Sequence, residues 1–479
     1  MPPHDNTRHD RAAGTERQSL SRRRLLELGS IAAAAGLAGC GGDGGSGDGG
    51  SGDGGSGDGG SGDGGSGDGG SGGGGEETAS EIGYWNIHNG DDFREPINTI
   101  VSDFEDSAGT TVNTRYVDND DISEQLSSAV ASDTLPNVGL LAIQTIQRLG
   151  ADGTLSAEST TSVVDEIGED DFRDGPLQFM SDGDGGYYGV PADAWVQGIW
   201  YRKSAFEEEG LEPPVTWDAI LTAAQAFHDP DNNTYGIGFG TQVDAYARQC
   251  FTQFARSNDA RVVDADANVV FDSQEMVETL EYYQQLSQYT PGSVTFNDTR
   301  SLYGNRQEHM FLYSSYLLPD LLADEGEEMV ADTGLAPATE KQRRSTYGQV
   351  LGHCIFDDTD ARLTASEDLV NHVMSGDSYV NWVHTQPGGT MPVLQSTSES
   401  DAYRDNETLS AWSDTISQIS SALGNMERFD VVDGTLVPEF GQISSQSLVA
   451  EAVNRVCISG DDPETVATEQ AEKMRNALE

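Results

Sequence analysis

The sequence predicts an α/β protein whose folded part has more than one lobe. Strand-like and helix-like patterns alternate between residues 82 and 143, an order typical of a mostly parallel sheet covered by helices. The first 75 residues lack the composition of a hydrophobic core. About 400 residues remain for folded structure, more than the roughly 250–300 residues at which single cores stop growing.

The elements of the first half follow from their apolar periodicity. The pattern predicts in turn a strand, a helix, a strand, a helix and a buried strand, over 82–87, 96–109, 112–116, 122–130 and 138–143. Pro96 stands at a first helical position, and Gly109 closes that helix. Ligands of such sheets lie at the carboxyl ends of strands, so the turn at 85–90 is a candidate binding region.

The second half contains further strands and helices in a less regular order. Strands are expected at 196–201, 235–239, 310–313 and 351–356. Helices are expected at 217–224, 243–256, 274–289 and 366–384, over much of the chain after 407, and from Pro463 onward. Thr216 and Asp462 are suited to cap two of these helices, because their side-chain oxygens accept hydrogen bonds from exposed backbone amides.

The N-terminal 39 residues have the form of an export signal. The positive segment Ser-Arg-Arg-Arg-Leu-Leu at 21–26 leads into an apolar stretch, Leu25 to Gly39, that is too short to span a membrane. Arginines directly before leucines resemble the twin-arginine signal. Leu-Ala-Gly-Cys at 37–40 resembles a lipobox, in which cleavage leaves the Cys40 thiol for attachment of a lipid. We therefore expect residues 1–39 to be a twin-arginine-type signal peptide and Cys40 to be lipidated.

A tether follows Cys40. Residues 41–75 repeat Gly-Gly-Ser-Gly-Asp, a composition that gives a flexible coil with an end-to-end distance of about 30–35 Å. Residues 40–75 therefore predict a lipid anchor and spacer. They would hold the protein at the extracellular face of the cell membrane and leave it free to move there.

The charge argues against nucleic acid as a partner. The formal net charge is −55, from 26 Lys+Arg against 81 Asp+Glu, so the chain repels phosphate backbones. Lysine occurs only at Lys203, Lys341 and Lys473. Excess acid with few lysines is typical of a protein that works in concentrated salt, where screening reduces self-repulsion.

A central block of sequence resembles a known family. The run Tyr-Gly-Val-Pro-Ala-Asp-Ala-Trp-Val-Gln-Gly-Ile-Trp-Tyr-Arg-Lys at 188–203, with Pro-Val-Thr-Trp-Asp at 214–218, is similar to extracellular solute-binding proteins of the maltose-binding type. Shorter segments at 129–136, 229–236 and 382–392 add weaker support in the same order. The likeness covers residues 80–475.

The resemblance implies two α/β lobes joined by a hinge, with the ligand in the cleft between them. Lobe one would comprise residues 80–192 and 349–387, and lobe two residues 193–348 and 388–479. The implied function is the substrate-binding subunit of an ABC importer. Such a monomer captures a small sugar or oligosaccharide by lobe closure and delivers it to the transmembrane permease subunits. No enzymatic activity, cofactor or metal is implied.

A sugar site needs aromatic platforms together with amide, carboxylate and hydroxyl partners. The candidate ligand contacts are Trp85, His88, Asn89, Asp193, Trp195, Thr241, Tyr246, Tyr313, Tyr316 and Met391. Trp195, Tyr246 and Tyr316 stand where the resemblance implies ligand contacts. A core position is an equal alternative for Trp85. Gln-Ile-Ser-Ser-Gln at 442–446 replaces the late tryptophan of some sugar binders, which argues against a long linear oligosaccharide.

Other functions stay open on the sequence. A polyol, a glycerol phosphate or a peptide could replace the sugar. A phosphorylated ligand would need a basic cleft, for which Arg202, Arg248 and Arg300 are the few candidates. A lipid-anchored glycan-active enzyme would show opposed carboxylates roughly 5–10 Å apart. The acidic segment 264–275 fits several positions of a calcium loop, but Val269 stands where glycine is needed.

Two further side-chain types are assigned to the core. Cys250, Cys354 and Cys457 show no metal-ligand spacing, and we expect them to be buried small hydrophobes that form at most one disulfide. Trp382 lies within a helical pattern, where core packing is the expected role.

Overall fold

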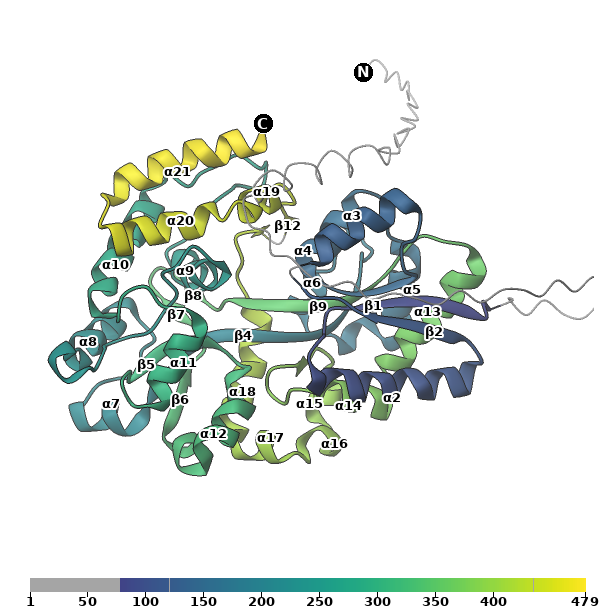
Figure 1. The fold of residues 1–479 in the computed structure, drawn as a ribbon, viewed down its shortest axis with the longest axis horizontal. Coiled ribbons are helices and arrows are strands. Elements are labelled where there is room, and N and C mark those ends of the chain that lie inside the picture. The colour runs from purple at the N-terminus through teal and green to yellow at the C-terminus, as the bar shows by residue number, and fades with distance from the viewer. Residues whose placement is uncertain (1–77, 120, 434) are drawn as a thin grey trace, which may run out of the picture.

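The computed structural model describes residues 78–119, 121–433 and 435–479 (Figure 1). The predicted signal peptide, Cys40 and the tether lie outside these residues. In the described part, helices surround a central sheet, which confirms the predicted α/β class.

One mixed sheet runs through the molecule in the order β10-β4-β9-β3-β1-β2, and β5 and β6 pair with the far part of β4. Its strands are β1 (Glu81–Asn86), β2 (Thr111–Tyr116), β3 (Val138–Ala142), β4 (Val190–Arg202), β5 (Met310–Ser314), β6 (Thr333–Ala336), β9 (Gly348–Ile355) and β10 (Met391–Pro392). β1 runs parallel to β2 and β3, whereas β9 is antiparallel to both β3 and β4. The expected parallel order is therefore correct for β1–β3 only, because β9 enters the sheet from the opposite end.

The long strand β4 belongs to both ends of the sheet. Its residues 190–196 pair with β9, and residues 193–194 also pair with β10 on the other side. Residues 197–202 pair with β5 and β6 instead. Figure 1 shows β4 and β9 crossing the middle of the molecule between two groups of helices. Two short hairpins complete the strands, β7 (Thr339–Glu340) with β8 (Arg344–Ser345) and β11 (Val431–Val432) with β12 (Thr435–Leu436).

Most helices of the β1–β3 end come from the first half of the chain. The helices here are α2 (Asp91–Ala108), α3 (Ile122–Ser132), α4 (Ile143–Ala151), α5 (Ala157–Ile167), α6 (Asp174–Gln178), α13 (Asp360–Val373), α14 (Gly376–Val383), α15 (Gln395–Glu399) and α16 (Asp401–Arg404). α2 begins before the predicted Pro96, because Asp91 and Asp92 in its first turn interact favourably with the positive helix end. The single helix predicted at 366–384 is split into α13 and α14 at Gly376, whose φ is +51°.

The remaining helices are α7 (Lys203–Glu209), α8 (Trp217–Phe227), α9 (Ala245–Ser257), α10 (Gln274–Leu286), α11 (Phe296–Gly304), α12 (Leu317–Asp332), α17 (Glu407–Ala411), α18 (Ser413–Ala422), α19 (Phe440–Ser445), α20 (Leu448–Asn454) and α21 (Pro463–Leu478). Thr216 and Asp462 cap α8 and α21 as predicted. The strand predicted at 235–239 makes only single bridges, because Gly236 packs directly on α8. A Cβ at Gly236 would lie 2.0 Å from the backbone oxygen of Ala224.

The buried side chains form two hydrophobic cores. The first core includes β1–β3 and most of β9, and also residues of α12 and of the segment 391–426. The second core includes α8–α10 and the C-terminal helices α19–α21. The chain passes between the cores in several places, and three of these connecting segments lie close together: 196–199 within β4, 336–350 before and in β9, and 426–429. The candidate site lies where these segments meet.

Candidate ligand-binding site

Three aromatic side chains meet where β4 passes from one core to the other. Trp195 of β4 is half-buried and lies opposite Gln349 of β9. Its ring centroid is 5.8 Å from that of Tyr347 and 6.4 Å from that of Tyr316. Trp195 and Tyr316 are partly exposed, whereas Tyr347 is buried. We call Trp195, Tyr316 and Tyr347 the aromatic cluster; it offers apolar ring surface to solvent.

A glycine turn makes room for Tyr316. This tyrosine directly precedes α12, and its ring packs against Gly389. A Cβ at Gly389 would lie 2.4 Å from the Cδ1 atom of Tyr316, so the close approach requires glycine. Met391 follows the turn in β10, where it is fully buried and pairs with Ala194. Met391 therefore supports the site from within the first core.

Two glutamine side chains extend the site. Gln144 of α4 and Gln349 of β9 are partly exposed, and we call them the amide pair. Nε2 of Gln349 donates to Oε1 of Gln144 at 3.0 Å, and Nε2 of Gln144 donates to Oε1 of Gln349 at 3.4 Å. Arg428 also donates to Oε1 of Gln349. The pair supplies neutral hydrogen-bonding groups close to Trp195, the residue opposite Gln349.

The charge of Arg428 is neutralised inside the protein. Its side chain is buried, and Nε and Nη2 donate to the two carboxylate oxygens of Asp430, both at 2.8 Å. Its guanidinium also lies 5.6 Å from the ring centroid of Tyr347. Burial by itself lowers the pKa of Arg428, but the carboxylate of Asp430 outweighs this effect and the net shift of the pKa is upward. Arg428 is therefore a paired cation.

His88 and Asp193, both predicted as ligand contacts, bind each other. Nε2 of His88 lies 3.0 Å from Oδ2 of Asp193, and the same oxygen accepts from Nε1 of Trp382 at 3.0 Å. The ring of His88 stacks on Phe93 with centroids 4.2 Å apart. Asp193 is fully buried, and its contact with His88 links the turn after β1 to β4. Trp382 is buried as well, which confirms its predicted core role.

Three predicted residues of the middle of the chain are used in local packing. The hydroxyl of Thr241 donates to the backbone oxygen of Gly292 at 2.8 Å, and that of Tyr246 donates to Leu312 at 2.6 Å. Both side chains are buried. Tyr313 belongs to the first core. Burial raises the pKa of Tyr246 and of Tyr313 above its ordinary value, so both hydroxyls stay protonated.

Trp85 and Asn89 have partners at the β1–β2 end of the sheet. The guanidinium of Arg115 on β2 lies 4.7 Å from the ring centroid of Trp85, which is nearly buried. Arg94 of α2 donates to Oδ1 of Asn89. Of the ten predicted contacts, the structure brings Trp195 and Tyr316 together at one partly exposed place, with Met391 buried behind them.

Sequence reasoning missed Gln144, Tyr347, Gln349 and Arg428. Gln144 lies two residues after the end of β3. Ligands of such sheets bind at the carboxyl ends of strands, and this principle, which indicated the turn after β1, also indicates Gln144. Tyr347 and Gln349 precede the predicted strand at 351–356, because β9 begins three residues earlier than the apolar pattern indicates. No local signal marks Arg428, since its partners Gly348 and Gln349 are 80 and 79 residues away.

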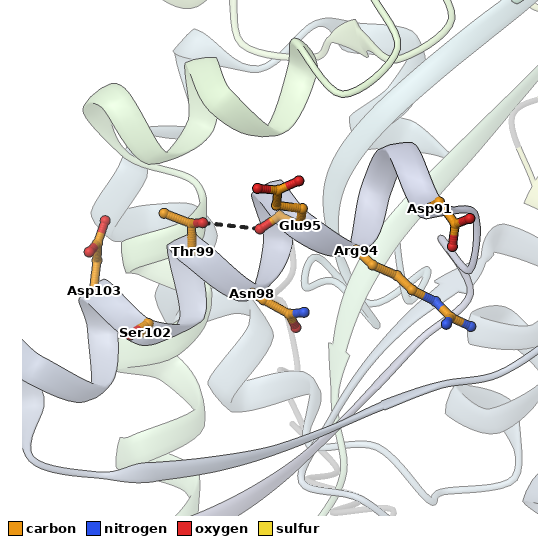
Figure 2. A pocket seen from close by; sticks show the side chains of 7 residues that line it. All are labelled: Asp91, Arg94, Glu95, Asn98, Thr99, Ser102 and Asp103. Carbon is orange, nitrogen blue, oxygen red and sulfur yellow. Dashed lines mark hydrogen bonds between the residues drawn. The ribbon is translucent and has the colours of Figure 1, made fainter.

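Two surface hollows lie away from these residues. One, of about 510 Å³, follows the outer face of α2 between Asp91 and Asp103. Figure 2 shows its lining side chains, all of which come from this helix. The other, of about 440 Å³, lies along α5 beside Asp182. Neither is lined by a predicted contact, and each borders essentially one exposed helix face, so we place the candidate site at the β4–β9 crossing.

Of the three arginines named for a phosphorylated ligand, two are paired with acids, whereas Arg248 is partly buried on α9 and has no ion pair among the described residues. Arg202 lies 2.7 Å from Asp332, and Arg300 lies 2.8 Å from Asp320 and 2.6 Å from Asp324. Among the described residues no group of three or more His, Cys, Asp or Glu side chains is placed to hold a metal ion. The site is therefore built from aromatic and neutral amide groups.

The cysteines of the described part are unpaired. Cys250 and Cys354 are buried, as predicted, and Cys457 is partly buried. Burial raises the pKa of each thiol to about 12, which makes all three poor nucleophiles. Asp264, in the rejected calcium loop, accepts hydrogen bonds from Asp266 and Asn268 within its own turn.

Aromatic rings and amides at the junction of two cores are groups typical of a site for a small solute. Residues 99–411, well over half of the chain, match the family of bacterial extracellular solute-binding proteins, and the protein belongs to this family. No helix within the described ranges is both long and apolar enough to cross a membrane.

Named relatives and solved structures agree with this assignment. The chain is 28% identical to YcjN of Escherichia coli (strain K12), whose name describes an ABC transporter periplasmic-binding protein; the match covers 80% of this chain and 89% of YcjN. The fold is similar to the sugar-binding protein MalE from Xanthomonas citri (TM-score 0.69, 19% identity, 83% and 97% of the two chains). It is also similar to an Agrobacterium radiobacter K84 solute-binding protein in complex with ribitol (TM-score 0.68, 17% identity, 84% and 99%).

Proposed function

We propose that the protein is the substrate-binding subunit of an ABC importer and that its ligand is a small neutral sugar. The observation that carries the proposal is the partly exposed aromatic cluster beside the amide pair. Sugar rings present C–H faces that stack on aromatic rings, and hydroxyls that exchange hydrogen bonds with amides. YcjN and MalE, which are named for ABC transport and sugar binding, support this function by similarity.

The charges near the site favour a neutral ligand over a glycerol phosphate or another anion. Arg428 forms an ion pair with Asp430, and Arg202 and Arg300 form ion pairs with acids of α12. Of the arginines named for a phosphorylated ligand, Arg248 of α9 alone has no ion-pair partner among the described residues. Binding a phosphate would require a free cation or a cluster of donors directed at it. The large acid excess of the chain would add long-range repulsion of an anionic ligand at low salt.

Ligand capture would proceed by hinge closure. The proposed lobes are residues 80–192 with 349–387 for lobe one and residues 193–348 with 388–479 for lobe two, with β4 among the connections; within lobe two, the segment 391–426 packs into the first core. The half-buried Trp195 at the junction would then become covered when the lobes close. The protein would bind its ligand without changing it chemically, as expected for a transport subunit. Proton NMR of a sugar incubated with the protein checks this, because new resonances would indicate catalysis.

The protein would act at the extracellular face of the membrane as a monomer. Export by the twin-arginine signal of residues 1–39 and lipidation of Cys40 would leave the binding domain on the tether of residues 41–75, next to the permease. Its acid excess and scarcity of lysine favour operation in concentrated salt.

A thermal-shift screen in concentrated salt tests the ligand class. Panels of mono- and disaccharides, polyols, sugar phosphates and peptides would be compared. A ligand at 100 times its dissociation constant stabilises the folded state by about 2.7 kcal/mol. We expect a shift with at least one neutral sugar. A shift with polyols alone would assign the site to the polyol class, and shifts with only peptides or sugar phosphates would refute the proposal.

A further inference from the structure

Arg428 joins three segments at the junction of the two cores. It lies in the connecting segment 426–429, and its Nη1 donates to the backbone oxygen of Gly348 at 3.0 Å, at the start of β9. Tyr347, one residue earlier, packs against its guanidinium. The backbone oxygen of Tyr347 in turn accepts from the amide of Gln197 in β4 at 2.8 Å. One buried side chain is therefore linked to all three connecting segments.

Arg428 also determines which way the amide of Gln349 points. A guanidinium has only donors, so Gln349 presents its oxygen to Nη1, and a reversed amide would place donor against donor. Nε2 of Gln349 then points to Gln144, which presents its own oxygen at 3.0 Å. Arg428 donates to Gln349, and Gln349 and Gln144 donate to each other, with the shorter bond from Gln349 to Gln144. Each amide nitrogen carries two hydrogens, and one on each glutamine has no acceptor among the described residues.

We propose that Arg428 is a positioning residue for ligand binding, which holds the amide pair so that two N–H donors are presented beside Trp195. The site then selects ligands with acceptor oxygens at that place. This inference rests on the proposed function and goes beyond it by assigning the polarity of the site. Arg428 itself is 1% exposed and each of its three side-chain nitrogens donates to a protein acceptor, so in this proposal it acts through Gln349 and does not touch the ligand.

A second buried arginine provides a matched control. Arg256 is 2% exposed and pairs with Glu427 at 3.0 Å, next to Arg428 in the chain. Its hydrogen-bond partners are Glu427 and the backbone oxygen of Ala260, and neither belongs to the amide pair. Arg256→Lys and Arg428→Lys therefore each shorten a buried cation of an ion pair, although Glu427 is partly exposed and also pairs with Arg343. Arg428→Lys alone removes the guanidinium that donates to Asp430, Gly348 and Gln349 at once. The ammonium group of lysine is a compact donor and cannot span these three acceptors.

The test compares these variants of the full chain by two measurements. Calorimetric titration with a ligand from the neutral sugar panel is expected to show at least a tenfold loss of affinity for Arg428→Lys and less than a twofold change for Arg256→Lys. Without ligand, side-chain amide spectra of protein labelled with ¹⁵N-glutamine report the orientation directly. The side-chain amide signals of Gln349 can be identified because they are missing in Gln349→Ala. We expect these signals to shift in Arg428→Lys and to stay unchanged in Arg256→Lys.

Unchanged amide signals or unchanged affinity in Arg428→Lys would overturn the inference. If the wild-type protein bound no sugar, the proposed function would fail, while the amide spectra would still decide whether Arg428 orients Gln349. If Arg428→Lys does not fold, Gln349→Met replaces it, because this change leaves the Arg428–Asp430 pair intact. A tenfold weaker affinity in Gln349→Met supports the inference, and wild-type affinity rejects it.

Discussion

Trp195 of β4 and Tyr316 at the start of α12 meet edge to face, with ring centroids 6.4 Å apart and ring planes at 70°. The two residues are 121 positions apart in the chain, and both remain partly exposed. This geometry is typical of stable aromatic pairs, and it leaves ring surface available to a ligand.

Replacing Trp195 with alanine is expected to weaken ligand binding about tenfold, which corresponds to about 1.4 kcal/mol. The melting temperature of the free protein is expected to change little, because the side chain is only half-buried. Calorimetric titration of the variant measures the loss. Tyr235→Ala, another partly exposed aromatic outside the cluster, is the control and is expected to keep wild-type affinity.

The change Gly389→Ala tests the support of Tyr316. The added methyl group would lie 2.4 Å from Cδ1 of Tyr316, so the ring must move or the turn must open. We expect a loss of about 1–3 kcal/mol in the free energy of unfolding, together with weaker ligand binding. Gly441→Ala on α19 meets nothing within 4 Å and is expected to be neutral or stabilising. Equal urea midpoints for the two variants would contradict the packing argument.

Glu308 makes stability fall as pH rises. Its side chain is fully buried, and neither carboxylate oxygen has a partner among the described residues. Burial, with a smaller contribution from Asp298, raises the pKa of Glu308 well above its ordinary value. Between the unfolded and the folded pKa the folded state binds the extra proton, so this group lowers stability by about 1.4 kcal/mol per pH unit as pH increases.

The variant Glu308→Gln is expected to remove this dependence, because an amide does not titrate. Its urea midpoint should exceed that of the wild type by a margin that grows from pH 5 to pH 8. Glu472→Gln, at an exposed position of α21, is the control and should follow the wild-type curve. Parallel curves for Glu308→Gln and wild type would show that the Glu308 carboxyl titrates alike in the folded and unfolded states.

The melting temperature is expected to rise with salt. At a net charge of −55 the folded chain repels itself, and raising ionic strength from 0.1 M to 1 M shortens the Debye length from about 10 Å to about 3 Å. Scanning calorimetry in sodium chloride between these limits measures the effect. A melting temperature independent of salt would argue against adaptation to concentrated salt.

Cys40→Ser is expected to release the protein into the medium, because serine cannot form the thioether to a lipid. Fractionation of cells into membrane and medium checks this. Cys457→Ser changes a thiol of the folded domain and should leave the protein with the membrane fraction. Membrane retention of Cys40→Ser would refute the lipid anchor.

The sequence predicted the fold class and named part of the candidate site, because these depend on local patterns. The helix and strand periodicity of residues 82–143 marks β1–β3, and the block around Trp195 is contiguous in sequence. The pairing of His88 with Asp193 spans 105 residues, and only the folded chain shows that they are partners of each other. The same holds for Arg428, whose proposed role depends on its contact with Gln349. The two residues are 79 positions apart and meet only in the folded chain.

The sharing of β4 has a consequence for unfolding. Residues 190–196 supply an inner strand to one part of the sheet, and residues 197–202 supply the strand on which β5 and β6 assemble. Loss of either part removes hydrogen-bond partners from a strand that the other part needs. The two cores are therefore expected to melt as one cooperative unit in a single calorimetric transition, in contrast to domains joined only by a loose linker.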